Sequence, residues 1–215
     1  MPARIPEFAL LEKYGIGLIP YGIAKNESEA TRIAKKLGYP VALKVISPEI
    51  VHKTDYSAVK VGIKNEERLL AAYEDIMENV RGHKVSGMLV QKMARKGLEL
   101  IIGGKKDPQF GHMVVLGLGG VYVEVFRDVS ARICPIRRQD VKEMLLELRS
   151  NPLITGVRGM KPIDLDALEL LMVKVCRMMV EEDILEMDLN PVIFDEHGYD
   201  IVDVRLRRGW PCGKT

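Results

Sequence analysis

The fold of this chain is decided by the stretch Val41-Ala42-Leu43-Lys44-Val45-Ile46-Ser47-Pro48-Glu49-Ile50-Val51-His52-Lys53-Thr54-Asp55. Its apolar, β-branched first half predicts a buried strand that carries one cation, Lys44, and Pro48 ends this strand. The polar loop that follows presents His52 among charged neighbours. A strand lysine suits phosphate neutralisation, and an imidazole that titrates near neutrality can accept and release a phosphoryl group. The stretch therefore indicates phosphate chemistry beside a sheet.

A structural interpretation of the same two residues stays open. The stem of Lys44 can pack along the sheet while its ammonium stays hydrated. His52 can equally be a solvated loop residue, because single histidines and lysines are common in proteins. Residue type alone does not separate the two interpretations.

The flanking segments predict a small α+β unit, roughly residues 20–85. Asn26 is followed by Glu29 and by apolar residues at helical spacing, so a capped helix is predicted to start there and to end at Gly38. A strand over 59–63 then leads to a second helix, which Asn65 caps.

The rest of the chain is strand-rich. Strands are predicted at 87–93, 98–102, 112–116 and 131–136, helices at about 139–149 and 165–182, and a final hairpin over 184–194 and 199–205. The change in pattern predicts two α+β lobes with a cleft between them.

Composition narrows the function classes. The chain has 215 residues, of which 47% are hydrophobic and 29% charged, as in a globular protein. A net charge of +2 gives no case for nucleic acid binding, and no apolar run reaches the ~20 residues that a membrane span needs. The start of the chain lacks the apolar segment of a signal peptide, so we expect a cytoplasmic protein.

The cysteines predict neither a disulfide framework nor a zinc site. Cys134, Cys176 and Cys212 are odd in number, far apart and without a CxxC pair. Cys134 and Cys176 are expected to be small apolar residues of the core.

The last hairpin carries oxygen ligands. Strand alternation places Glu186, Asp188 and Asn190 on one face, and the hairpin can bring Asp203 alongside Asn190. Carboxylate and amide oxygens without sulfur or imidazole suit Mg²⁺, which keeps waters and shares its sphere with phosphates. The alternative is a solvated polar face on an edge hairpin.

Two further features allow either a phosphate site or a structural role. Gly117-Leu118-Gly119-Gly120 can cradle a phosphate or form a tight strand connection, and the structural role is favoured. Arg132 and Arg158 can donate paired hydrogen bonds to phosphate or form surface ion pairs.

Several motifs then occur in one order along the chain. They are Lys44 on its strand, Ser-Pro-Glu-Ile-Val-His-Lys-Thr-Asp (47–55), Asp-Pro-Gln-Phe-Gly (107–111), Gly-Leu-Gly-Gly (117–120), Val-Glu-Val (123–125), Arg158-Gly159 and Glu-Met-Asp-Leu-Asn-Pro-Val (186–192). Together they resemble the ATP-grasp (β) subunit of ADP-forming acetyl-CoA synthetases, also called NDP-forming acyl-CoA synthetases, over about residues 8–206. The resemblance implies an α+β, ATP-grasp fold whose two lobes clamp a nucleotide. The implied domains are a lead-in (1–22), a small lobe (23–86), a large lobe (87–209) and a tail (210–215).

The resemblance also implies an activity and a set of site residues. The activity is that of an ADP-forming acid–CoA ligase, in which acyl-CoA, ADP and phosphate give the acid, CoA and ATP. ATP or ADP and Mg²⁺ are the implied cofactors, and a CoA-binding α subunit, in an α2β2 assembly, is the implied partner. The implied roles are phosphate relay for His52, phosphate binding for Lys44, adenine contact for Gln91, Lys92 and Met93, ribose binding for Glu99, charge neutralisation for Arg132 and Arg158, and Mg²⁺ ligation for Asn190 and Asp203.

One departure from the family pattern bears on activity. The family loop continues from its Asp into Val-Gly-Gly-Val, whereas this chain has Tyr56-Ser57-Ala58-Val59. Two glycines would let backbone N–H groups approach phosphate, whereas Ser57 can offer its hydroxyl as a donor instead. A nucleotide-binding regulatory or structural subunit, or a different ATP-grasp ligase, therefore remains an alternative.

Overall fold

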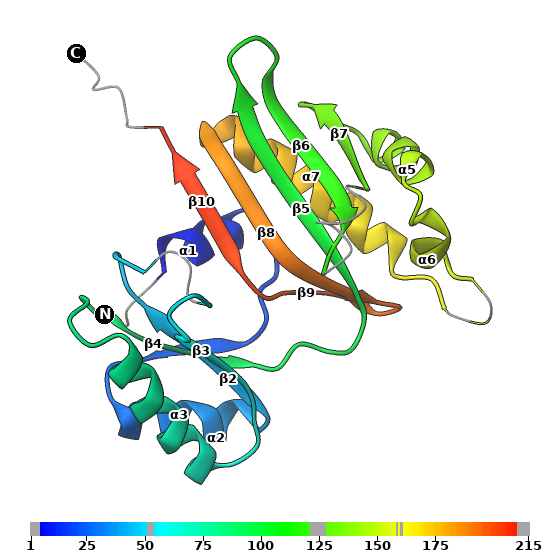
Figure 1. Ribbon diagram of the computed structural model, residues 1–215. Coiled ribbons are helices and arrows are strands. Elements are labelled where there is room, and N and C mark those ends of the chain that lie inside the picture. The colour runs from blue at the N-terminus through cyan, green and yellow to red at the C-terminus, as the bar shows by residue number, and fades with distance from the viewer. Residues whose placement is uncertain (1–4, 51–53, 121–127, 158, 160, 210–215) are drawn as a thin grey trace, which may run out of the picture. The chain divides into compact units, whose positions relative to one another are not determined.

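A computed structural model describes residues 5–50, 54–120, 128–157, 159 and 161–209 of the chain (Figure 1). The chain divides into two compact units, of which the first contains Ile19–Met93 and the second contains Ile5–Leu18 together with the chain from Ala94 onward. Each unit has its own antiparallel sheet and its own hydrophobic core. The predicted α+β class, with two sheets in place of one continuous parallel sheet, is confirmed.

The first unit is a four-stranded sheet with two helices on one face (Figure 1). The strand order is β1 (Tyr21–Ala24), β4 (Gly87–Lys92), β2 (Val41–Ile46) and β3 (Val59–Ile63), and all neighbours are antiparallel. The helices are α2 (Glu27–Leu37) and α3 (Glu66–Asn79).

Both helices of this unit begin at the predicted asparagine caps. The side-chain oxygen of Asn26 accepts from the backbone N–H of Glu29 at 2.9 Å, and that of Asn65 accepts from Arg68 at 2.9 Å. Each cap satisfies one of the helix's unpaired N–H groups and contributes about 1 kcal/mol. Gly38 ends α2 in the left-handed region, at φ +78°, where glycine is favoured.

The second unit is a six-stranded antiparallel sheet. Its order is β10 (Val204–Arg208), β8 (Ile184–Asp195), β5 (Leu98–Asp107), β6 (Gly111–Leu118) and β7 (Val129–Ile133), and β9 (Gly198–Ile201) pairs with the far end of β8. The helices of this unit are α1 (Pro6–Lys13), α5 (Arg138–Glu147), α6 (Asn151–Thr155) and α7 (Leu165–Glu181).

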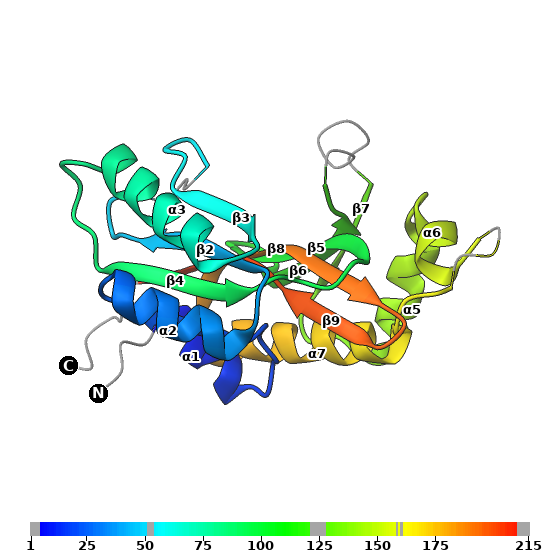
Figure 2. The same ribbon diagram turned by 90° about the horizontal axis from the view of Figure 1, so that it is seen from below.

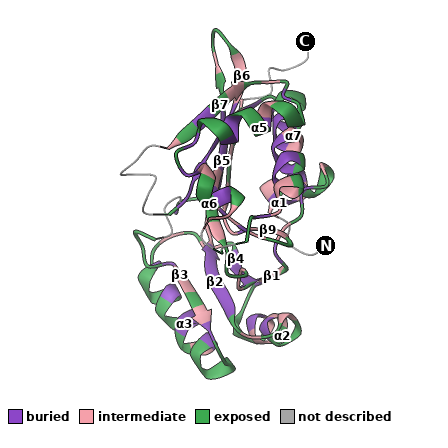
Figure 3. Cartoon of the chain, turned by 90° about the vertical axis from the view of Figure 1, so that its right-hand side faces the viewer, coloured by how far each residue is buried: buried purple, intermediate pink, exposed green. Residues whose placement is uncertain are grey.

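Helix α7 supplies much of the core of the second unit. It lies along one face of the sheet and contacts β5, β6 and β8 (Figure 2). Its apolar side chains at helical spacing, among them Leu168, Met172 and Val175, are fully buried, and Figure 3 shows the buried stripe. Gly104 of β5 admits the helix closely, since a Cβ there would lie 2.1 Å from Sδ of Met179.

The predicted domain boundaries stay predictions. The strand that follows the boundary predicted at residue 86 is β4, and its pairing is clear. β4 begins at Gly87, directly after the predicted end of the small lobe at residue 86. Its Gly87–Lys92 backbone nevertheless pairs with β1 on one side and β2 on the other, inside the first sheet.

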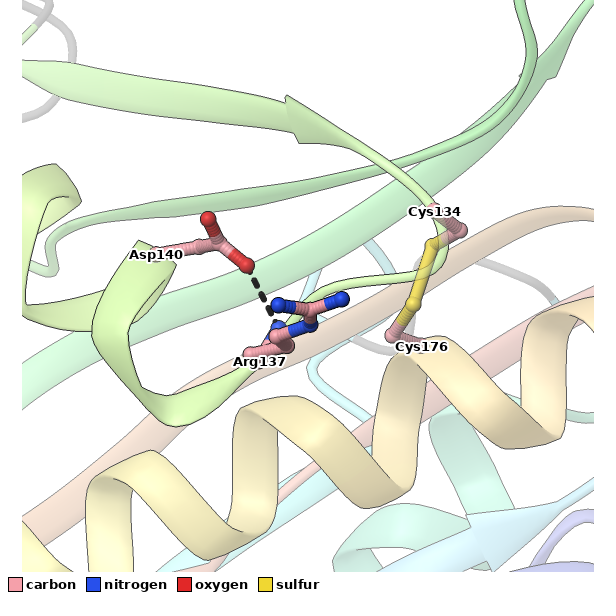
Figure 4. The surroundings of a disulfide bond; sticks show 4 residues. All are labelled: Cys134, Arg137, Asp140 and Cys176. Carbon is pink, nitrogen blue, oxygen red and sulfur yellow. Dashed lines mark hydrogen bonds between the residues drawn. A yellow bond between two sulfur atoms is a disulfide. The ribbon is translucent and has the colours of Figure 1, made fainter.

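The prediction that the cysteines form no disulfide is wrong, because Cys134 and Cys176 are joined by one (Figure 4). Both nevertheless belong to the core as predicted, since Cys176 is buried in it and Cys134 packs against it. Cys134 follows the end of β7 and Cys176 lies on α7, with the Cα atoms 5.9 Å apart, within the range that a disulfide needs. The two residues are separated by 42 positions, and only the packing of α7 brings them together. Between them α5 begins, where the Asp140 carboxylate accepts from the Arg137 backbone N–H at 2.6 Å (Figure 4).

Within the described part of the chain, none of the helices combines the length and the apolar character that crossing a bilayer requires.

Candidate functional site

Lys44 lies on a polar stripe of the first sheet. It is on β2, opposite Leu89 of β4, and Ala42 two residues earlier is opposite Gln91. Residues that oppose each other across a ladder share a face, so Lys44 and Gln91 point to the same face as diagonal neighbours.

This stripe faces away from the helices of its unit. The alternate residues Leu43, Val45 and Val90 belong to the core under α2 and α3, whereas Lys44 and Gln91 do not. Both polar side chains are nevertheless buried, with 5% of Lys44 and 2% of Gln91 exposed. The two neighbouring inner strands β2 and β4 therefore hold one cation and one amide on the same face.

Hydrogen bonds fix the end of β4 at Lys92 and Met93, two of the residues predicted to face adenine. The Lys92 backbone N–H donates to the carbonyl of Pro20 at 2.9 Å, and that of Met93 donates to Pro40 at 3.3 Å. The Met93 sulfur accepts from the Gly62 N–H at 3.3 Å. The segment 91–93 is therefore held on both edges, as a surface for a flat ring requires.

The departure at residues 56–59 has a structural consequence. Ser57 adopts φ +49°, in the left-handed region where glycine is favoured, so a position of glycine-type backbone is occupied by serine. Its N–H donates to the carbonyl of Thr54 at 3.0 Å, and Ala58 is fully buried. The loop thus keeps the backbone turn that a glycine would provide. His52 and its two neighbours lie outside the described residues.

In the second unit, Glu99 is exposed near the start of β5, and its carbonyl accepts from the Gly119 N–H at 2.6 Å. Glu99 is thereby joined to the glycine motif that follows β6. The motif's remaining neighbours at 121–127 and the predicted phosphate ligand Arg158 lie outside the described residues.

The predicted adjacency of Asn190 and Asp203 is confirmed. The Asn190 N–H donates to the Asp203 carbonyl at 3.3 Å, and the Val202 N–H donates to Pro191 at 3.1 Å. The side chain of Asp203 is 28% exposed and lies 3.6 Å from the Arg205 guanidinium. An amide and a carboxylate are therefore presented side by side at the surface.

Asp188 adds a third polar group that sequence reasoning placed on the same face without giving it a role. The pKa of Asp188 is raised, mainly by burial and also by the negative charge of Asp203. The positive charge of Arg205 and a hydrogen bond with Asn190 lower this pKa in part. Clustered carboxylates of this kind favour a bound cation, because a cation relieves their mutual repulsion.

The donor set fits Mg²⁺. No group of three or more His, Cys, Asp or Glu side chains in the described residues is arranged to hold a metal by itself. A carboxylate and an amide oxygen, completed by waters and phosphate oxygens, are instead the usual Mg²⁺ environment in nucleotide sites.

Arg132 is paired within its own unit. Its guanidinium donates to both Glu147 oxygens, at 2.6 and 3.0 Å. Arg132 holds the pKa of Glu147 well below its usual range, at about 2, with help from the Ser130 hydroxyl. A phosphate would have to compete with Glu147, a partner fifteen positions along the chain that no sequence spacing indicated.

A groove of about 520 Å³ lies beside the disulfide of the second unit. It is lined mainly by apolar atoms, with His112 and the Arg177–Glu181 pair among its polar groups. None of the predicted site residues lines it.

Comparison with known proteins places these features in a family. Residues 5–207 match the model of the ATP-grasp domain. An ADP-forming acetate–CoA ligase I of Archaeoglobus fulgidus is 48% identical over 205 residues, covering 93% of this chain and 30% of that longer protein. The β subunit of the corresponding ligase I of Pyrococcus furiosus is 40% identical, covering 92% of this chain and 87% of the subunit.

Solved structures agree with this assignment. The dinucleotide-forming acetyl-coenzyme A synthetase 1 of Ca. Korarchaeum cryptofilum, in complex with coenzyme A and Ca-AMPCP, superposes with a TM-score of 0.90 at 43% identity, covering 94% of this chain and 91% of that chain. Another structure of the same enzyme holds Mg-AMPPCP, with its phosphohistidine segment pointing towards the nucleotide-binding site, and superposes with a TM-score of 0.82 at 42% identity, covering 94% of this chain and 90% of that chain. The chain therefore belongs to the ATP-grasp family, and it is similar to the β subunits of ADP-forming acetate–CoA ligases.

Proposed function

We propose that this chain is the nucleotide-binding subunit of an ADP-forming acid–CoA ligase. The observation that carries the proposal is the pair Asn190 and Asp203, held together by the backbone bond of 3.3 Å in a chain that matches the family over residues 5–207. The polar stripe of Lys44 and Gln91 supports it from the first unit. In this role the chain binds Mg-ADP or Mg-ATP.

The proposed roles follow from the chemistry of each group. Lys44 neutralises phosphate charge from a rigid strand, and Glu99 accepts from ribose hydroxyls. Gln91, Lys92 and Met93 contact adenine, while Asn190 and Asp203 hold Mg²⁺, which lowers the charge repulsion between phosphates when bound. Arg132, once released from Glu147, and Arg158 add positive charge for the transferring phosphoryl group.

The proposed relay runs through His52. An imidazole nitrogen of His52 takes the phosphoryl group from a phosphohistidine of the partner subunit, whose P–N bond breaks as the new P–N bond forms. A terminal phosphate oxygen of ADP then attacks this phosphorus, the bond to His52 breaks, and ATP results. Relatives that are named β subunits imply a partner α subunit; we propose that this partner binds CoA and that the assembly is α2β2.

A second candidate rests on the loop departure. With Ser57 at φ +49° and Ala58 buried, the loop offers fewer bare backbone N–H groups to phosphate than a Gly-Gly pair would. A subunit that binds nucleotide without transferring phosphate is the function that this loop would favour.

Co-expression with a CoA-binding α subunit separates the two candidates. The first predicts ATP formation from one or more acyl-CoAs in a panel, with ADP, phosphate and Mg²⁺. It further predicts that His52→Ala abolishes ATP formation while the Kd for Mg-ADP stays within about threefold. His197→Ala, at an exposed hairpin turn, is the matched control and should keep activity.

Two outcomes would decide against the first candidate. Full ATP synthesis by His52→Ala would remove His52 from the reaction. Tight Mg-ADP binding without turnover on any acyl-CoA would support the non-transferring subunit.

A further inference from the structure

Glu99 and the glycine motif after β6 meet at one end of the β5–β6 hairpin. The register pairs Leu100 with Leu118, and beyond this pair the Glu99 carbonyl accepts from the Gly119 N–H at 2.6 Å. Glu99 and Gly119 are therefore fixed against each other at the point where β6 ends.

The two glycines leave room for different parts of Glu99. A Cβ on Gly119 would lie 2.9 Å from both the carbonyl carbon and the carbonyl oxygen of Glu99. A Cβ on Gly120 would lie 3.1 Å from the carboxylate oxygen Oε2. Gly119 thus accommodates the main chain of Glu99, and Gly120 accommodates its charged end.

A tight turn alone does not explain why both Gly119 and Gly120 are glycine. Gly120 has φ +73°, so its backbone conformation favours glycine by itself, but Gly119 has no positive φ. What excludes a side chain at Gly119 is the approach of Glu99. Gly117, in contrast, makes room for Val129 and Asp128 beside β7, which is a separate task.

The other side of Glu99 is fixed as well. Glu99 pairs with Ile193 of β8, and a Cβ on Gly97 would lie 2.1 Å from the carbonyl oxygen of Phe194. With its main chain held between β8 and Gly119, Glu99 can vary only in its side chain. A side chain at Gly120 would crowd the carboxylate in its present position, because its Cβ would lie 3.1 Å from Oε2.

We propose that Gly119 and Gly120 are positioning residues, whose missing side chains leave room for the Glu99 carboxylate in the orientation that accepts from both ribose hydroxyls of the nucleotide. This inference rests on the proposed function, in which Glu99 binds ribose. A carboxylate that a neighbouring Cβ displaces can no longer accept from both hydroxyls of a vicinal diol at hydrogen-bond distance. The motif thereby acts on the sugar end of the nucleotide through Glu99.

The test compares ADP with 2′,3′-dideoxy-ADP, both with Mg²⁺, on the full chain by calorimetry. Wild type should bind ADP about tenfold or more tightly than the dideoxy analogue, the effect of one or more charge-assisted hydrogen bonds. Glu99→Gln should reduce this preference strongly. Gly120→Ala should reduce it to within about twofold of the Glu99→Gln value, and the double variant should lose no more.

Gly111→Ala is the matched control. Gly111 has φ +76°, close to that of Gly120, and lies at the other end of the same hairpin, but a Cβ there would meet nothing within 4 Å. It introduces the same backbone strain without touching Glu99, so it should keep the full preference for ADP.

The outcomes separate the two proposals. Absence of ADP binding by wild type would overturn the proposed function. ADP binding with an unchanged preference in Glu99→Gln would remove Glu99 from ribose recognition, and the inference with it. Loss of the preference in Glu99→Gln but its retention in Gly120→Ala would overturn the inference alone, and an equal loss in Gly111→Ala would assign the effect to backbone strain.

Discussion

The backbone N–H of Asn190 donates to the carbonyl of Asp203 at 3.3 Å, which joins the middle of β8 to the segment that precedes β10. The next described bond, from Val202 to Pro191 at 3.1 Å, continues the pairing on the other side. The positions of the two candidate ligands are therefore set by main-chain bonds of the sheet, independently of any bound ion.

Asp203→Asn should weaken Mg-ADP binding about tenfold or more, while the affinity for ADP in EDTA changes less than about twofold. The carboxylate charge is lost but the main-chain bond to Asn190 is kept, so the hairpin should remain folded. Calorimetry with and without Mg²⁺ measures both affinities. Glu186→Gln on β8, where the Glu186 side chain pairs with Arg207 at 3.1 Å, is the control. Equal weakening in both conditions would count against Asp203 as a metal ligand.

Lys44→Met should abolish most of the thermal stabilisation that ADP confers, because the phosphate loses its cation while methionine fills the space of the lysine stem. Differential scanning fluorimetry over an ADP titration reads this effect. Lys60→Met on the neighbouring β3, which removes a lysine that pairs with Asp75 at 3.1 Å, should keep the shift. A normal shift in Lys44→Met would leave Lys44 with a packing role.

Reduction of the Cys134–Cys176 disulfide should lower the free energy of unfolding. Chain-entropy reasoning gives an upper value of about 4 kcal/mol for a cross-link across 42 residues. Urea denaturation with and without reductant measures the change, and intact mass reports a loss of about 2 Da on oxidation. Cys176→Ala should unfold at the same urea concentration in both conditions. A wild-type midpoint that does not respond to reductant would show that the bond contributes nothing.

The Glu147 carboxyl should titrate with a midpoint near its pKa of about 2, because Arg132 stabilises the charged form. A folded-state pKa below the unfolded value means that the pair contributes stability fully above about pH 4.3, and that this contribution is lost as the pH falls through about 2. NMR titration of the side-chain carboxyl carbon gives the midpoint. Arg132→Gln should move the midpoint back towards the ordinary value near 4.3.

Local signals in the sequence were sufficient to predict an element where tertiary packing favours the same structure. Asn26 and Asn65 were identified as caps because a cap and its helix are adjacent in sequence, and both bonds form at 2.9 Å. The helix predicted at 165–182 is α7, Leu165–Glu181, because its apolar spacing matches the face that the sheet covers. The acidic hairpin was likewise readable from strand alternation.

Short elements and long-range pairs were not predictable in the same way. Strand β1 has four residues and includes Gly22, so it has little strand pattern of its own and forms because β4 pairs with it. The first half of β5 was predicted, but its extension to Asp107 passes through Gly103 and Gly104, which local propensity disfavours. Packing against Met179 of α7 requires the glycine at 104. Cys134 and Cys176 meet only through that packing.

The burial of Lys44 has a consequence for chemical labelling. An amine reagent reacts with accessible, deprotonated amino groups, and Lys44 is 5% exposed, whereas the side chain of Lys161 is 72% exposed. Acylating reagents will therefore reach Lys161 and other surface lysines long before Lys44. The rate at which Lys44 is modified then reports how often its side chain becomes accessible to solvent, with or without nucleotide.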